Sequence, residues 1–194
     1  MKITLITTLN FPYVILNEVK NLSYIIGKSM KIDVLCVGKI KEKFYRDAID
    51  EYSKRLSRYC SLNVIEVADE KTPDNASDAV VEGILSKEAE RLAKHLPEAT
   101  GIGTDSYIIT LEINGKKMTS EKLADHLNNL GINGISHIFL IIGGSLGLHN
   151  SITGRADFHL SFSDMTFPHQ LMRVILLEQI YRSYRIINNE PYHK

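Results

Sequence analysis

The segment His137-Ile-Phe-Leu-Ile-Ile142, followed at once by Gly143-Gly-Ser-Leu-Gly147, is the part of the sequence that decides the fold. The segment has the length of a strand, and every residue from Ile138 to Ile142 is apolar. A strand that is apolar on both faces is typical of the centre of a sheet that helices cover on each side. We therefore expect an α/β fold in which the glycines lie just beyond the carboxyl end of a central strand.

Strand and helix signals alternate on both sides of this segment. Pro97, the Gly101–Gly103 loop and Pro168 mark places where elements break or begin. The expected strands are 31–38, 62–67, 107–113, 137–142 and 158–162, and the expected helices are 42–59, 77–96, 119–130 and 168–187. A turn is expected at Asn114-Gly115. This alternation predicts an α/β domain with a mostly parallel sheet flanked by helices.

The chain is 194 residues long, which suits one well-packed domain, and its formal net charge is zero. A neutral chain is not a general binder of nucleic acids, so any contact with RNA must come from a local patch. The candidate patch is the C-terminal stretch, whose charged residues are Arg173, Arg182, Arg185 and Lys194 against Glu178 and Glu190. A solvated helix face explains these charges equally well.

The sequence also indicates a compartment and excludes some classes of site. Cys36 and Cys60 are too few for a disulfide framework, so we interpret them as small apolar core residues and expect a reducing, cytoplasmic compartment. The histidines show no zinc-ligand spacing, so no metal is expected. The apolar runs are too short to cross a bilayer, so no membrane contact is expected.

Residues 1–29 differ from the rest of the chain. Pro12 and several polar residues interrupt any regular apolar spacing, and the uninterrupted apolar centre of a secretory signal is missing. Met30 then opens a clean strand. Our hypothesis is that Met30 is the natural start, that 1–29 is an upstream extension outside the fold, and that 30–194 forms the domain.

The expected final helix is apolar around most of its circumference. Its apolar residues are Leu171, Met172, Val174, Ile175, Leu176, Leu177, Ile180, Tyr181 and Tyr184. Packing on a sheet buries only one stripe of a helix, so this helix needs a second partner. A homodimer interface would cover the remaining stripe, and the sequence therefore predicts a homodimer.

Three strand ends are candidates for a ligand site, because ligands of open α/β sheets bind beyond the carboxyl ends of the strands. One is Gly143, where the missing Cβ lets a ligand approach the backbone, although the run is neither a dinucleotide fingerprint nor a P-loop. The others are Leu111 and the polar loop that begins at Phe162. A tight turn explains Gly143 equally well, and helix capping or turn chemistry is the alternative for the serines and Thr166 of that loop.

The tail Tyr192-His193-Lys194 is a fourth candidate. A tyrosine and a histidine can stack on or hydrogen-bond to an unpaired base, and a lysine can reach a phosphate. A frayed terminus without a role is the plain alternative.

Together these motifs resemble the ribosomal large subunit pseudouridine methyltransferase H family. The matching motifs are Val-Gly-Lys-Ile-Lys-Glu-Lys (37–43), Ile-Thr-Leu-Glu-Ile-x-Gly-Lys (109–116), Ile-Gly-Gly-Ser-x-Gly-Leu (142–148), Leu-Ser-Phe-Ser-x-Met-Thr-Phe-Pro-His-Gln-x-x-Arg (160–173), Glu-Gln-x-Tyr-Arg (178–182) and Pro-Tyr-His-Lys (191–194). The resemblance covers 30–194, and residues 1–29 have no counterpart in the family.

The resemblance implies more than the residues do by themselves. It implies the SPOUT methyltransferase fold with a C-terminal trefoil knot, a homodimer, and S-adenosylmethionine as cofactor. It implies methylation of N3 of a pseudouridine in 23S rRNA on the assembled ribosome. Matched by motif, the cofactor contacts are Leu111, Gly143, Phe162, Ser163, Asp164, Met165, Thr166 and Phe167.

Methyl transfer to an imide nitrogen requires that the N3 proton be removed, since only the deprotonated nitrogen is a good nucleophile. His193 and Tyr192 are the expected groups for positioning or deprotonating the base, with Arg173 as an electrostatic partner. We interpret His169 as structural or adjacent to the cofactor. Two rival functions remain at this point: a SPOUT methyltransferase for another rRNA or tRNA site, and a non-catalytic ribosome-binding module.

Overall fold

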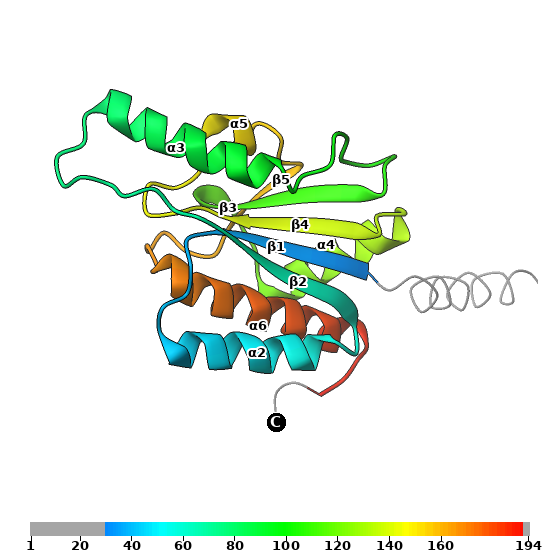
Figure 1. The fold of residues 1–194 in the computed structure, drawn as a ribbon. Helices are drawn as coiled ribbons and strands as arrows, with labels where there is room; N and C mark the ends of the chain where they lie inside the picture. The colour runs from blue at the N-terminus through cyan, green and yellow to red at the C-terminus, as the bar shows by residue number, and fades with distance from the viewer. Residues whose placement is uncertain (1–29, 192–194) are drawn as a thin grey trace, which may run out of the picture.

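The computed structural model describes residues 30–191, which form one five-stranded sheet with helices on both faces (Figure 1). The strands are β1 (Met30–Val37), β2 (Cys60–Val67), β3 (Ser106–Lys117), β4 (His137–Ile142) and β5 (Phe158–Ser161). The helices are α2 (Lys43–Leu56), α3 (Asp78–Ala93), α4 (Ser120–Ile132), α5 (Asn150–Thr153) and α6 (His169–Ile187). Every strand pair is parallel, in the order β2-β1-β4-β3-β5, so the predicted α/β fold with a parallel sheet is confirmed.

β4 lies at the centre of the sheet, as its apolar sequence predicted. It pairs with β1 on one side and with β3 on the other, and Ile138 through Ile142 are buried. The carboxyl end of β4, with Gly143 directly after it, therefore lies between the ends of β1 and β3.

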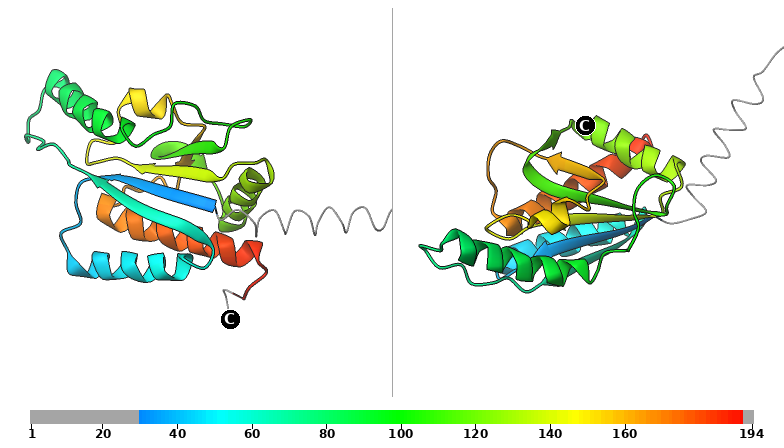
Figure 2. Two further views of the ribbon diagram at one scale, coloured as in Figure 1. Left: turned by 45° about the vertical axis from the view of Figure 1, so that its right-hand side comes forward. Right: turned by 90° about the horizontal axis from the view of Figure 1, so that it is seen from above.

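The helices form two layers of unequal size (Figure 2). α2, α4 and α6 cover one face, where Leu140 of β4 and Leu176 of α6 belong to the larger core. α3 and α5 cover the other face, where Phe139 of β4 and Leu92 of α3 belong to the smaller core. Alternate residues of β4 thus enter different cores, because successive side chains of a strand point to opposite faces.

The end of β3 differs from the sequence prediction. The chain does not turn away at Asn114-Gly115, because β3 continues to Lys117 and pairs with β5 again after a register shift between Leu111 and Lys116. Gly115 lies against β5 so closely that a Cβ built on it would be 2.7 Å from the backbone carbon of Leu160. The Asn-Gly pair therefore bulges within a longer strand, and the glycine permits close contact between the two backbones.

α6 is covered more completely than its sequence alone suggested. It packs against both α2 and α4 as well as the sheet, and every residue from Leu171 to Tyr184 is buried or half-buried. The expectation of a long exposed patch on this helix in a single chain is therefore wrong, because two neighbouring helices cover stripes that a sheet alone would leave open. The homodimer stays a prediction. No helix in 30–191 has both the length and the apolar character needed to cross a bilayer.

The helix caps and core cysteines predicted from the sequence are confirmed to different degrees. Thr119 caps α4 and accepts a hydrogen bond from the Lys122 backbone N–H at 3.3 Å. Ser77 takes the capping position of α3 but makes no side-chain capping bond. Cys36 and Cys60 are free and buried, as expected of core residues, and burial raises the pKa of each thiol to about 12.

We expect a chain that begins at Met30 to unfold at the same temperature as the whole chain. Residues 1–29 lie outside the described residues, and their sequence has no regular apolar spacing that would add a face to the core. Thermal unfolding of the two chains, followed by circular dichroism, measures this. A lower midpoint for the shorter chain would mean that residues 1–29 stabilise the fold.

Candidate active site

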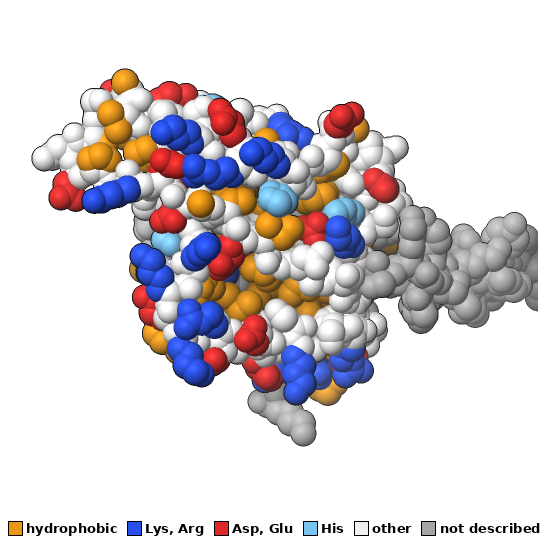
Figure 3. Space-filling view, in the orientation of Figure 1, with side chains coloured by type: hydrophobic (Ala, Val, Ile, Leu, Met, Phe, Trp, Pro, Cys, Tyr) orange, Lys and Arg blue, Asp and Glu red, His pale blue; other side chains and the backbone are white. Residues whose placement is uncertain are grey.

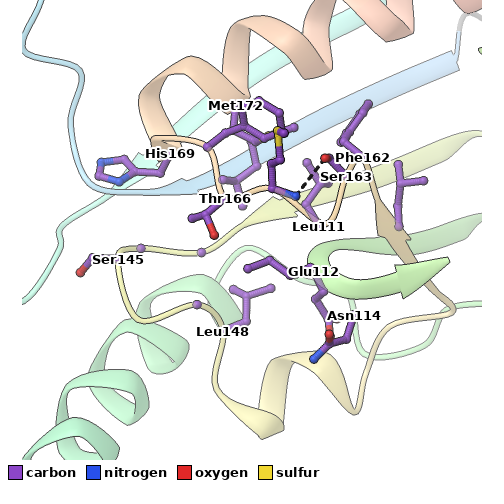
Figure 4. A pocket seen from close by; sticks show the side chains of 18 residues that line it. Leu111, Glu112, Asn114, Ser145, Leu148, Phe162, Ser163, Thr166, His169 and Met172 are labelled. Atoms are coloured by element: carbon purple, nitrogen blue, oxygen red, sulfur yellow. Dashed lines mark hydrogen bonds between the residues drawn. The ribbon is translucent and has the colours of Figure 1, made fainter. Parts of the chain in front are cut away.

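A cavity of about 280 Å³ lies at the carboxyl edge of the sheet, beyond the ends of β3, β4 and β5. The loop after β4 and the loop between β5 and α6 form opposite walls, with Leu148 on one side and Thr166 on the other (Figure 4). Most of the lining is apolar or glycine. The three strand ends selected from the sequence therefore do meet at one site.

The loop after β4 depends on its glycines. A Cβ built on Gly143 would be 2.3 Å from the carbonyl oxygen of Gly147, and Gly147 itself has a φ of 88°, which favours glycine. Gly147 also donates a backbone hydrogen bond to the Gly144 carbonyl at 3.2 Å. The tight turn and the ligand site, posed as alternatives for Gly143, are therefore two aspects of one structure, because the turn forms a wall of the cavity.

The loop after β5 is held by its serines. The buried Ser161 hydroxyl donates to the Ile113 carbonyl at 2.8 Å, which links β5 to the bulge of β3. The Ser163 hydroxyl accepts from the Met165 backbone N–H at 2.9 Å and fixes the next turn (Figure 4). The turn chemistry considered for these serines is confirmed, and its effect is to shape the cavity wall.

Seven of the eight residues matched to the cofactor line this cavity. They are Leu111, Gly143, Phe162, Ser163, Met165, Thr166 and Phe167. The eighth, Asp164, does not line it, because its exposed carboxylate forms an ion pair with Lys117.

A family model described as "Predicted SPOUT methyltransferase" matches residues 30–193. This chain belongs to the SPOUT methyltransferase family. The "Ribosomal RNA large subunit methyltransferase H" of Bifidobacterium adolescentis is 62% identical to it over 165 residues, which cover 85% of this chain and 100% of the relative. The "Putative ribosomal RNA large subunit methyltransferase H" of Methanococcus maripaludis is 64% identical over 165 residues, with the same coverage of each chain.

Solved structures are less similar to this SPOUT methyltransferase. The SpoU methyltransferase AviRb of Streptomyces viridochromogenes, crystallised with AdoMet, aligns at 12% identity with a TM-score of 0.43 and covers 88% of this chain and 63% of its own. The "putative methyltransferase Lpg2936" of Legionella pneumophila, with bound SAM, aligns at 11% identity with a TM-score of 0.45 and covers 81% of this chain and 67% of its own. The family assignment rests on the family model and on the relatives that match over their whole length.

Arg173 of this SPOUT methyltransferase lies inside the fold, where its side chain is fully buried. The guanidinium donates to Glu66 Oε1 at 2.6 Å and to the carbonyls of Val37 and Gly38 at 2.9 and 2.8 Å. Among the described residues its Nε has no hydrogen-bond partner. Arg173 thus ties α6 to the ends of β1 and β2, and its role as an electrostatic partner of the tail stays a prediction.

The proposed basic patch of the C-terminal stretch is also neutralised. Arg182 forms an ion pair with Glu178 at 2.7 Å, and Arg185 forms one with Glu190 at 3.0 Å. With Arg173 buried, the patch offers little surplus charge in the described part of the chain. The helix-face interpretation of these charges is the better one.

Two polar residues of the cavity were missed or undervalued in the sequence. Glu112 lines the cavity, and its Oε1 accepts from the Thr110 hydroxyl at 2.5 Å and lies 2.7 Å from His159 Nδ1. Among the described lining residues it carries the only carboxylate. A charged residue directly after the mostly apolar strand segment 107–111 was the signal for it.

His169, the first residue of α6, also lines the cavity, which agrees with its interpretation as cofactor-adjacent. Burial lowers the pKa of His169, and the charge of Arg173 lowers it further. The imidazole is therefore neutral at pH 7 and can accept or donate one hydrogen bond at the cavity wall.

The predicted catalytic residues Tyr192 and His193 lie outside the described residues, as does Lys194. The two residues before them are fixed far from the cavity. Glu190 accepts a hydrogen bond from the Tyr59 hydroxyl at 2.6 Å, and the Pro191 carbonyl accepts one from Arg185 at 2.6 Å. Tyr59 directly precedes β2, so the tail begins at the amino edge of the sheet, opposite the cavity.

Proposed function

We propose that this SPOUT methyltransferase transfers a methyl group from S-adenosylmethionine to N3 of a pseudouridine in 23S rRNA of the large ribosomal subunit. The whole-length relatives are named for methylation of large-subunit ribosomal RNA, and the sequence motifs resemble the pseudouridine enzymes of that group. The observation that carries the proposal is the cavity where the two motif-bearing loops meet. The expected substrate is the assembled ribosome in the cytoplasm.

The lining of the cavity suits the cofactor chemically. Its volume of about 280 Å³ is just below the usual range for small-molecule sites, roughly 300–1,000 Å³. Apolar walls exclude water from the methyl group, the glycine loop brings backbone close to the ligand, and Glu112 supplies a negative charge. The bound cofactor supplies a methyl group on a positively charged sulfonium, which is already activated for transfer.

The protein must then orient the base and accept the N3 proton. An imidazole can accept a proton, so His193 is our candidate for the proton acceptor, while Tyr192 would hold the base by stacking or hydrogen bonding. Holding the nitrogen in line with the methyl group is the other part of the rate enhancement.

This role of the tail supports a homodimer. α6 has 19 residues, so at 1.5 Å per residue it is roughly 28 Å long, and it leads from the cavity to the opposite edge of the sheet. The three residues after Pro191 span at most about 11 Å when fully extended. The tail therefore falls short of the cavity in its own chain, and we propose that it serves the cavity of a partner protomer.

Methyl transfer from labelled S-adenosylmethionine to ribosomes, isolated large subunits and naked rRNA tests the function. We expect label in 23S rRNA of ribosomes, at a pseudouridine located by nuclease digestion and mass spectrometry. Label in tRNA, or in another rRNA nucleotide, would favour the rival SPOUT activity. Cofactor binding without transfer to any of these would favour the non-catalytic module.

We expect Glu112→Gln to weaken S-adenosylmethionine binding about tenfold, since the lost charge faces a cationic ligand across a mostly apolar cavity. S-adenosylhomocysteine lacks the sulfonium charge, so its affinity should fall less. Titration calorimetry with both ligands measures the two changes. Glu98→Gln is the matched control, because it removes an exposed carboxylate that does not line the cavity and is not matched to the cofactor. Equal affinity of the Glu112 variant and the unchanged protein for S-adenosylmethionine would contradict the expectation.

A further inference from the structure

The connection between β1 and α2, together with the first turn of α2, presents cations and an aromatic ring to solvent. We call residues 39–46 the basic loop; its relevant side chains are Lys39, Lys41, Lys43, Phe44 and Arg46. Phe44 is 61% exposed, a high value for a large apolar side chain. Basic side chains gather over this end of α2 in the space-filling view (Figure 3). Exposed lysines with an aromatic ring among them are the composition of a surface that binds single-stranded nucleic acid.

The basic loop is held in one conformation. The Ile40 N–H donates to Glu66 Oε1 at 3.0 Å, and the Lys41 N–H donates to Gln170 Oε1 at 3.2 Å. Arg46 donates to the carbonyls of Ile40 and Lys41 at 3.1 and 2.8 Å. A ligand that binds here finds a loop that is already ordered, which lowers the entropic cost of binding.

The solvent-exposed side chains of the basic loop carry a positive charge. Lys39 and Lys41 are exposed, and no carboxylate of the described residues lies within ion-pair distance of either ammonium group. Lys43 pairs with Asp47, but its side chain is 79% exposed. Glu42 adds one negative charge, so the four cations Lys39, Lys41, Lys43 and Arg46 leave residues 39–46 with a net positive charge.

The basic loop lies next to the cavity. It follows Gly38, and a Cβ built on Gly38 would be 3.5 Å from His169 Nε2. His169 lines the cavity, and its neighbour Gln170 holds the loop. The loop that carries the lysines therefore adjoins the part of the cavity wall that His169 forms.

We propose that the basic loop docks the single-stranded part of the RNA substrate beside the target base. Lys39 and Lys41 bind phosphates, and Phe44 stacks on a flanking base. This assignment rests on the proposed function, and it takes the place of the C-terminal patch that the ion pairs neutralise.

Binding of labelled oligouridylate to the full-length chain, measured by fluorescence anisotropy over a range of salt concentrations, tests the lysines. Each phosphate contact on a single strand contributes about 0.7 to the slope of log affinity against log salt, so Lys39→Ala with Lys41→Ala should lower the slope by roughly 1.4. Lys54→Ala with Lys94→Ala is the matched control, because both lysines are exposed and lie away from the loop. Equal losses in the two double variants, or no loss in either, would overturn the proposal.

Phe44 tests the stacking contact and the rival occupant, a second copy of this chain. Phe44→Ala should weaken oligouridylate binding about tenfold, whereas Phe44→Trp should keep it. Light scattering should give all variants the mass of the unchanged protein. A change of mass with Phe44→Ala would mean that the ring belongs to a contact between copies, and the proposal would fail.

These measurements need neither cofactor nor turnover. If RNA binding depends on the basic loop but the protein transfers no methyl group to ribosomes, the RNA-binding role of the loop stands and the proposed function is rejected. If Lys39→Ala with Lys41→Ala leaves both RNA binding and methyl transfer to 23S rRNA unchanged, the proposed function stands and the RNA-binding role of the basic loop is rejected.

Discussion

Replacing Gly143 by alanine is expected to abolish S-adenosylmethionine binding. The added Cβ would be 2.3 Å from the carbonyl oxygen of Gly147 and 2.5 Å from its carbonyl carbon, which are backbone atoms that no rotamer change can move. The loop after β4 must open to relieve this contact, and it forms a wall of the cavity. Titration calorimetry should detect no binding at cofactor concentrations that saturate the unchanged protein.

Gly83→Ala is the control for a general effect of glycine replacement. Nothing lies within 4 Å of a Cβ built on Gly83, which is inside α3. Alanine favours a helix over glycine by about 1 kcal/mol, so this variant should bind normally and unfold at the same or a higher temperature. A Gly143→Ala protein that binds the cofactor with unchanged affinity would show that the loop accommodates a side chain.

Deleting residues 192–194 is expected to abolish methyl transfer while leaving cofactor binding intact. The deleted residues include both proposed base-positioning groups, and every residue matched to the cofactor lies earlier in the chain. Single-turnover transfer to ribosomes measures the first property, and calorimetry measures the second. A shortened chain that methylates ribosomes at the normal rate would leave the tail as an ordinary terminus.

Mixed dimers distinguish a tail that serves the partner from one that serves its own chain. Protomers without the tail keep a working cavity, and Gly143→Ala protomers keep the tail. Half of the dimers in an equal mixture are mixed and each has one complete site, so the mixture should recover about a quarter of the wild-type rate if the tail serves the partner. A mixture that stays as inactive as its components would reject the shared site.

The sequence predicted the layout of the fold because its elements have strong and independent signals. The run Ile138–Ile142 is apolar at every position, so only a central strand suits it. The end of β3 was harder to predict, since Asn114-Gly115 has the composition of a turn. Only the later pairing of Lys116 with Leu160 and of Lys117 with Ser161 shows that the strand resumes. The packing partners of α6 were equally hard to predict, because apolar spacing shows how much of a helix is apolar but not which helices pack against it.

The sequence predicted the site residues whose positions follow from the ends of strands. It was less informative about side chains whose contacts come from distant parts of the chain. Gly143 and Phe162 follow strands, and the carboxyl edge of a parallel sheet brings such ends together. An arginine such as Arg173 looks the same in the sequence whether it faces RNA or pairs with a carboxylate inside the fold, and only the structure shows its burial and its pairing with Glu66. Glu112 was overlooked because the sequence does not show that the end of β3 lines the cavity and lies beside His159 of β5.

The strand order has a consequence for how the chain is made. β1 can form its ladder with β2 early in synthesis, but its other neighbour β4 is translated much later, and β3 must wait for β5 as well as for β4. Long-range parallel pairings form slowly, and partly exposed sheet edges invite aggregation meanwhile. The nascent chain therefore carries the unpaired edge of β1 until Ile142 has left the ribosome, and the cavity cannot close until α6 begins. Slowing translation between β2 and β4 should prolong the interval in which chaperones bind.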